Sequence, residues 1–134
     1  MRVICKGLVT GDYSVLGLEH LIAIERKGLA DLVGCVGRDR ERFKRELERL
    51  KAFPYRALVI EANWSQIENG EFLGQVSPES VTASLLSWAM DGLPVIMAGD
   101  AAQAAQFVRR MLYTAANRRW KELMGFAQVM STAD

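Results

Sequence analysis

The sequence predicts an α/β fold: a three-layer sandwich built around a central mixed sheet. Compact apolar runs, typical of buried strands, occur at residues 21–25, 56–62 and 93–98. Helical segments with an apolar stripe or a clear start signal alternate with these runs. The chain has 134 residues, of which 50% are hydrophobic and 25% charged, enough for a continuous core. This order of elements predicts a sheet whose C-terminal part is parallel.

The N-terminal segment is expected to form a strand and a turn. Residues 2–9 are strand-like, with an interruption at Gly7. The Gly11-Asp12 pair is a turn signal, and it presents a short acid at the edge of that strand. Residues 14–20 are expected to form a loop or the tip of a hairpin.

The next segment predicts one buried strand and two helices. Residues 21–25 have no polar alternation, as expected for a central strand covered on both faces. A short helix is expected over residues 28–36. A longer helix is predicted over residues 38–53, where the apolar stripe at i, i+4 and i+7 is Phe43, Leu47 and Leu50.

The C-terminal half continues with loops, helices and a tail. Residues 63–76 are expected to form a loop, and Ser77 is the N-cap of a helix over 77–91. A further helix is expected from about 101 to 117. Residues 118–134 form a tail that docks as a last helical turn or packs against a partner; its large apolar residues include Trp120, Leu123, Met124 and Phe126.

Composition restricts the class of protein. The net charge is +1, so binding to nucleic acid must depend on local clusters of charge. The two cysteines, Cys5 and Cys35, lack metal-site spacing and fit a reduced cytoplasmic setting. No apolar run reaches the ~18 residues of a membrane span, and no signal-peptide pattern is present. We expect one domain over residues 1–134, with no membrane partner.

Charged residues at one sheet edge suggest a site for metal-dependent hydrolysis of a phosphodiester. Side chains at i and i+2 of a strand share a face, so Glu25 and Lys27 point the same way and Arg26 points opposite. Asp12 can reach the same edge from the hairpin. Two carboxylates suit Mg²⁺, and a nearby lysine can steady a phosphate during hydrolysis. The alternative for this pattern is structural, with Glu25 and Lys27 as a surface salt bridge and Asp12 as a turn acid.

A longer signature resembles the XPF-type structure-specific endonuclease domain. Its matching segments are GDYSV (11–15), IERKGLADL (24–32), GR (37–38) and LVIE (58–61). The family signature is Gly-Asp, a spacer, then Glu-Arg-Lys-x-x-x-Asp, and it is complete here. The likeness is detailed to about Ala62 and looser to about Asn117, and DLVGCVGRDRERFKRELERL is similar to short phage and prophage members. The resemblance implies a restriction-endonuclease-like fold.

The resemblance also implies roles for the signature residues. Asp12 and Glu25 are expected to bind Mg²⁺, with Mn²⁺ as a possible substitute, and Lys27 to be the catalytic lysine. Arg26 is expected to belong to the active-site charge cluster. Asp31 is expected to orient Lys27 or Arg26. These roles imply a metal-dependent DNA endonuclease that cuts near a branch or junction and acts in DNA repair.

Contacts to DNA are expected outside the signature. Arg38 matches the family's Gly-Arg and is expected to contact the phosphate backbone. The other basic residues of the 38–53 helix, including Arg42, either follow phosphates or form a solvated face of ion pairs. Trp64 is a candidate for stacking on a base. Glu61 ends a strand. It is either a residue of the site or a solvated acid at the end of the strand, and the sequence leaves both open.

The resemblance leaves two further expectations and two alternatives. Family members usually begin with a strand ending in Asp-x-Arg-Glu, and residues 1–10 lack this element, so we expect the domain to lack that first strand. XPF-type domains pair through their nuclease cores, which implies a homodimer. One alternative is a catalytically impaired DNA-binding or scaffold module of the same fold. The other is an α/β domain without nuclease activity.

Overall fold

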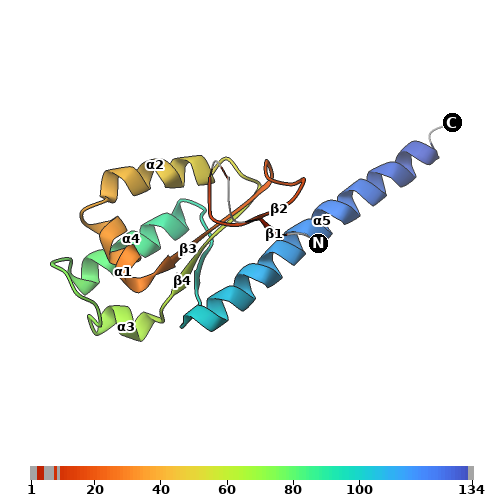
Figure 1. The fold of residues 1–134 in the computed structure, drawn as a ribbon. Helices are drawn as coiled ribbons and strands as arrows, with labels where there is room; N and C mark the ends of the chain where they lie inside the picture. The colour runs from red at the N-terminus through yellow and green to blue at the C-terminus, as the bar shows by residue number, and fades with distance from the viewer. Residues whose placement is uncertain (1–2, 5–7, 9, 133–134) are drawn as a thin grey trace.

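The centre of the molecule is a parallel sheet. The computed structural model describes residues 3–4, 8 and 10–132. Strands β3 (Ile22–Gly28), β4 (Tyr55–Glu61) and β5 (Val95–Met97) form it in the order β3-β4-β5, with both neighbouring pairs parallel. Residues 57–60 of β4 are completely buried, because helices cover both faces of the sheet. The predicted parallel C-terminal part is therefore confirmed (Figure 1).

An N-terminal hairpin covers the outer edge of β3. Strands β1 (Val3–Ile4) and β2 (Ser14–Val15) pair antiparallel. An antiparallel bridge then joins Tyr13 to Ile24, which makes the arrangement mixed. In the described residues β4, not β3, is the central strand. The expectation for 21–25 missed this because an edge strand covered by a hairpin is as apolar as a central one.

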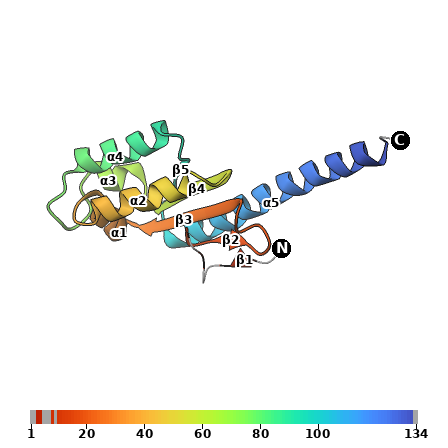
Figure 2. The same cartoon turned by 90° about the horizontal axis from the view of Figure 1, so that it is seen from above.

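Helices form a layer on each face of the sheet. One layer contains α1 (Leu29–Val36), α2 (Arg40–Leu50), α3 (Trp64–Glu68) and α4 (Pro78–Met90). The other layer is α5 (Ala101–Ser131). Figure 2 shows the two helical layers and the sheet from above. Each interface has its own apolar core: Leu58 and Ile60 of β4 face the first, and Val59 faces the second. The predicted three-layer α/β fold is confirmed.

Local capping explains where the helices begin. Ser77 accepts a hydrogen bond from the Ser80 amide at 3.1 Å, as expected of the predicted N-cap. Asp100 accepts one from the Gln103 amide at 2.8 Å and begins α5. Within residues 3–4, 8 and 10–132, no helix is both long and apolar enough to cross a membrane.

Helices α3 and α5 also differ from the expectation. Residues 64–68, expected as loop, form α3, because Asn63 and Gln66 make a capping box that begins a short helix there. Helix α5, expected to end near Asn117, continues to Ser131. No proline interrupts that stretch, and most of its residues are good helix formers.

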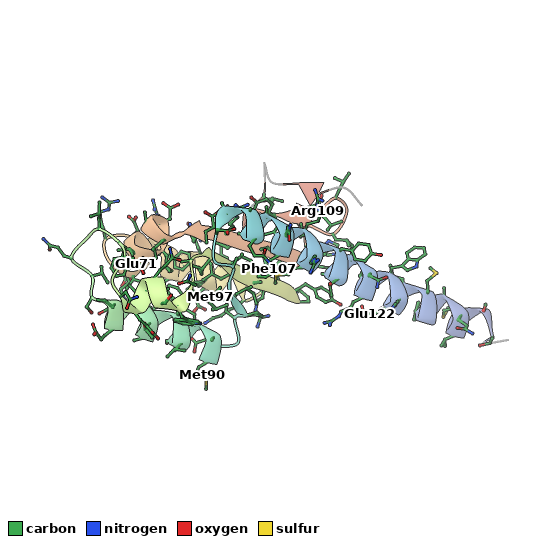
Figure 3. All side chains as sticks on the ribbon, turned by 90° about the horizontal axis from the view of Figure 1, so that it is seen from below. Glu71, Met90, Met97, Phe107, Arg109 and Glu122 are labelled. Atoms are coloured by element: carbon green, nitrogen blue, oxygen red, sulfur yellow. The ribbon has the colours of Figure 1, made fainter. Side chains whose placement is uncertain are left out.

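The far half of α5 extends beyond the sheet. Phe107 packs against the core beneath the sheet, whereas Glu122 lies past the sheet's end and accepts a hydrogen bond from the Tyr55 hydroxyl at 3.1 Å (Figure 3). Cys35 is buried. Cys5 and most of the strand predicted over 2–9 lie outside the described residues.

Candidate active site

Asp12 is fixed against β3 by the turn that carries it. Gly11 has φ +79°, and a Cβ there would lie 3.2 Å from the Ala23 Cβ, so this close approach requires glycine. The Asp12 amide donates to the Ile24 carbonyl at 2.8 Å. One Asp12 carboxylate oxygen accepts from the Arg26 amide at 2.9 Å. The Asp12 carboxylate thus accepts the backbone N–H of Arg26 at the sheet edge, and this hydrogen bond holds it at the site.

Glu25 and Lys27 share one face of β3, as the strand alternation predicts. The Lys27 ammonium lies 3.0 Å from a Glu25 carboxylate oxygen. It also lies 5.5 Å from the centre of the Phe43 ring on α2, within range of a cation–π contact. Glu25 is only 8% exposed and is one of the few buried polar residues in the described structure. A charge buried to this extent needs a partner, and Lys27 is that partner.

The three residues meet at one cavity. Its volume is about 280 Å³, and Asp12, Glu25 and Lys27 line it from the hairpin and β3. Helix α2 closes the other side with Glu46 and Arg49 among its lining residues. The sequence predicted that Asp12, Glu25 and Lys27 would come together, and the structure places them around a single opening.

Burial and neighbouring charges shift the proton affinities in this cavity. Burial raises the pKa of the Glu25 carboxyl, and the negative charge of Asp12 raises it further, while the hydrogen bond from Lys27 acts in the opposite direction. Burial tends to lower the pKa of the Lys27 ammonium, but its hydrogen bond to Glu25 and the charge of Glu25 raise it overall. Lys27 therefore carries its positive charge at neutral pH.

The donors at the cavity fit a divalent cation. Mg²⁺ prefers oxygen ligands and is commonly held by one or two carboxylates together with water and substrate phosphates. Asp12 and Glu25 supply two such carboxylates, and their mutual repulsion is what a cation would relieve. Among the described residues, no group of three ligand-type side chains lies close enough to hold a metal alone. Water and substrate phosphates would then supply the remaining ligands of a cation at Asp12 and Glu25.

Arg26 lies on the opposite face of β3. Its guanidinium donates from Nε to Glu61 on β4, and from Nη2 to the Ala101 carbonyl at the start of α5, 3.0 Å away. A longer contact of 3.5 Å joins Nη1 to the Tyr13 hydroxyl. Arg26 therefore ties β3, β4 and α5 together and is not part of the cavity. Glu61, whose role was left open, is its partner.

The remaining predicted site residues lie outside the cavity. Asp31 is exposed in the first turn of α1, and the described structure contains no ion pair between it and Lys27 or Arg26. The side chains of Arg38 and Arg42 are 89% and 68% exposed and both approach Asp39. Trp64 is partly exposed at the start of α3. The roles predicted for these four residues stay predictions.

Sequence reasoning missed two residues of the cavity, Glu46 and Arg49. Both come from α2, whose charged residues were considered as possible phosphate contacts without a view of which ones face the site. Glu46 and Arg49 are three residues apart and lie beside the apolar stripe of Phe43, Leu47 and Leu50, so their spacing was the available signal. What the sequence lacked was the rotation of α2 about its axis, which depends on how Phe43, Leu47 and Leu50 pack into the core.

Comparison with known proteins identifies the family. The sequence profile of the ERCC4 domain matches residues 1–111, most of the chain. The chain belongs to the ERCC4 domain family. The resemblance to the XPF-type nuclease domain predicted from the Gly-Asp and Glu-Arg-Lys-x-x-x-Asp signature is thereby confirmed. No match to a curated protein sequence was found.

A solved structure supports the same fold. XPF from Aeropyrum pernix superposes with a TM-score of 0.65 and 18% sequence identity. The match covers 96% of this chain and 60% of the archaeal chain. This ERCC4 chain therefore has the fold of an XPF nuclease domain, and it spans about three-fifths of the archaeal chain.

Proposed function

We propose that this ERCC4 domain is a divalent-metal-dependent DNA endonuclease that cleaves phosphodiester bonds at branched or junction DNA. The observation that carries the proposal is the meeting of Asp12, Glu25 and Lys27 at one cavity beside β3. Two carboxylates and a charged lysine suit hydrolysis of a phosphodiester, because the carboxylates can hold a cation and the lysine's positive charge can offset negative charge on the phosphate. Membership of the ERCC4 family supports the same reaction class.

Each residue has a distinct part in this proposal. Asp12 and Glu25 would hold Mg²⁺ or Mn²⁺, which when bound supplies Lewis-acid activation and offsets negative charge. Lys27 would donate a hydrogen bond to a phosphate oxygen as charge develops there. The contact of Lys27 with Phe43 and Glu25 limits its movement, so the ammonium is oriented before the substrate arrives. Arg26 would support these roles by holding β3 in place.

Helix α2 is the proposed DNA-facing element. Arg42 and Arg49 lie on the face of α2 that carries Glu46 toward the cavity, with Arg45 beside them. A basic stripe next to the reacting phosphate would hold the backbone of the duplex. Arg38, in the turn before α2, would extend this stripe. Trp64 lies at the start of α3 and would stack on a base only if the DNA reaches that edge.

A cleavage assay tests the proposal and separates it from the alternative. Forked DNA and linear duplex of the same sequence are incubated with the chain in Mg²⁺, Mn²⁺ or EDTA. We expect cleavage of the fork, little cleavage of the linear duplex, none in EDTA, and none by Asp12→Asn. Binding of the fork without cleavage in either metal would instead support the catalytically impaired module.

We further propose that the chain forms a homodimer through the far half of α5. Trp120 and Phe126 are 59% and 65% exposed there, and other apolar residues extend the same stripe; they are Leu123, Met124 and Met130. A long helix with an apolar stripe and no covering element is typical of a helix that packs against a partner. The parallel with XPF-type domains favours a second copy as that partner.

A further inference from the structure

Glu46 is the one acid of α2 that faces the candidate active site. It is half-buried and lines the same cavity as Asp12, Glu25 and Lys27. The other two acids of the helix, Glu41 and Glu48, line a separate cavity on the far side of α2. The rotation of the helix thus directs a single carboxylate toward the site.

Glu46 has no basic partner in the described part of the chain, because no basic side chain there forms an ion pair with it. Lys27 is already bound to Glu25. Among the described lining residues three acids face two bases, Lys27 and Arg49, so one negative charge is in excess there. A half-buried excess charge is unfavourable unless a cation offsets it.

Glu46 does not join Asp12 and Glu25 as a direct ligand. No three ligand-type side chains in the described structure are close enough to hold one cation directly. Glu46 therefore lies near the site but outside direct coordination.

We propose that Glu46 is a positioning carboxylate that holds, through water, the divalent cation that Asp12 and Glu25 would bind. This inference rests on the proposed metal-dependent function. Carboxylates outside the inner ligand set commonly orient bound water and neighbouring ligands in metal sites. Here the group comes from a helix that packs over the sheet, not from a strand, and the 280 Å³ cavity leaves room for the intervening water.

Binding of Mn²⁺ to the full metal-free chain, without DNA, tests the proposal. Free Mn²⁺ is followed by electron paramagnetic resonance during titration of wild type, Glu46→Gln, Glu46→Asp and Glu41→Gln. We expect Glu46→Gln to weaken binding by about 10- to 100-fold. Glu46→Asp retains the charge and is expected to recover most of the affinity, because contact through water tolerates a shorter side chain.

Glu41→Gln is the matched control. It makes the same charge change on the same helix, on the face directed away from the site. Its affinity is expected to equal that of the wild type. Equal losses in Glu41→Gln and Glu46→Gln would overturn the proposal, since they would indicate a general charge effect. Thermal unfolding of each variant verifies that the fold is retained.

Asp12→Asn separates this inference from the proposed function. Loss of binding in Asp12→Asn with wild-type binding in Glu46→Gln would overturn the role of Glu46 and leave the metal site standing. A wild-type chain that binds no Mn²⁺ would overturn both.

Discussion

Neighbouring residues of β3 serve different purposes because a strand alternates its faces. Glu25 and Lys27 point into the cavity, whereas Arg26 between them points to the other layer and bonds to Glu61 and the Ala101 carbonyl. In this Glu-Arg-Lys triplet, Glu25 and Lys27 belong to the candidate site, whereas Arg26 has a structural role. This difference follows from the alternation of side chains along a strand.

The first prediction concerns the turn that carries Asp12. Gly11→Ala is expected to lower the free energy of unfolding by about 2–4 kcal/mol, because alanine is disfavoured at φ +79° and its Cβ would press on Ala23 and the Ile24 carbonyl. Gly17→Ala is the control: its φ is +90°, but nothing lies within 4 Å of the added Cβ, so a loss of only about 1–2 kcal/mol is expected. Denaturant unfolding measures both, and equal losses would contradict the close approach.

The second prediction concerns Cys35. Burial raises the pKa of its thiol to about 11, although the charge of Lys27 acts against this. In a Cys5→Ser background at pH 8, Cys35 should react with iodoacetamide more than about a hundredfold more slowly in the native chain than in urea. The reaction of the native chain is expected to accelerate as the pH rises toward 11. Equal rates in the native and unfolded chains would contradict it.

Elements with a local signature were predictable, and those without one were not. The Ser77 cap and the Phe43 stripe of α2 are short-range patterns, and both helices formed, although α2 is shorter at each end than the predicted 38–53. Helix α3 has only five residues, too few for a periodic pattern, so its capping box was the one signal. The end of α5 was misplaced because its second half makes few contacts that a sequence pattern would reveal.

The same distinction applies to the candidate site. Asp12, Glu25 and Lys27 were predictable because strand alternation and the turn place them locally. Glu46 and Arg49 were not, because their position depends on how a whole helix packs on the sheet. Tertiary packing, not propensity, decides which face of α2 meets the cavity.

The third prediction tests the capping box of α3. Asn63→Ala removes the acceptor for the Gln66 amide and is expected to cost about 1 kcal/mol of unfolding free energy. Asn63→Asp keeps the acceptor and should cost little. Thermal or urea unfolding measures the difference, and an alanine variant as stable as the aspartate variant would show that the cap contributes nothing.

The shape of the molecule suggests how two copies would meet. The far half of α5 extends beyond the sheet with its apolar stripe exposed, while the proposed DNA-facing helix α2 lies in the other layer (Figures 1 and 2). A dimer formed through α5 would therefore leave the cavity at Asp12 accessible. Pairing and DNA binding would not compete for one surface.

The fourth prediction tests this dimer. Phe126→Glu should raise the dissociation constant of the dimer at least about tenfold, because it places a charge in an apolar contact. Leu73→Glu is the control, since Leu73 is 96% exposed in a loop away from α5. Sedimentation velocity over a range of concentrations measures both. A monomeric wild type, or identical dissociation constants for the two variants, would contradict the assignment.

In the proposed mechanism Lys27, beside Asp12 and Glu25, acts directly on a DNA phosphate. The single-turnover rate of cleavage of forked DNA in Mg²⁺ by wild type, Lys27→Met and Lys51→Met tests this role. Lys51 lies at the end of α2 and pairs with Glu48 and Asp91, outside the cavity, so its variant controls for loss of a positive charge. We expect a rate at least about a hundredfold lower for Lys27→Met and a rate near that of the wild type for Lys51→Met. Undiminished cleavage by Lys27→Met, or no cleavage by the wild type in Mg²⁺ or Mn²⁺, would contradict it.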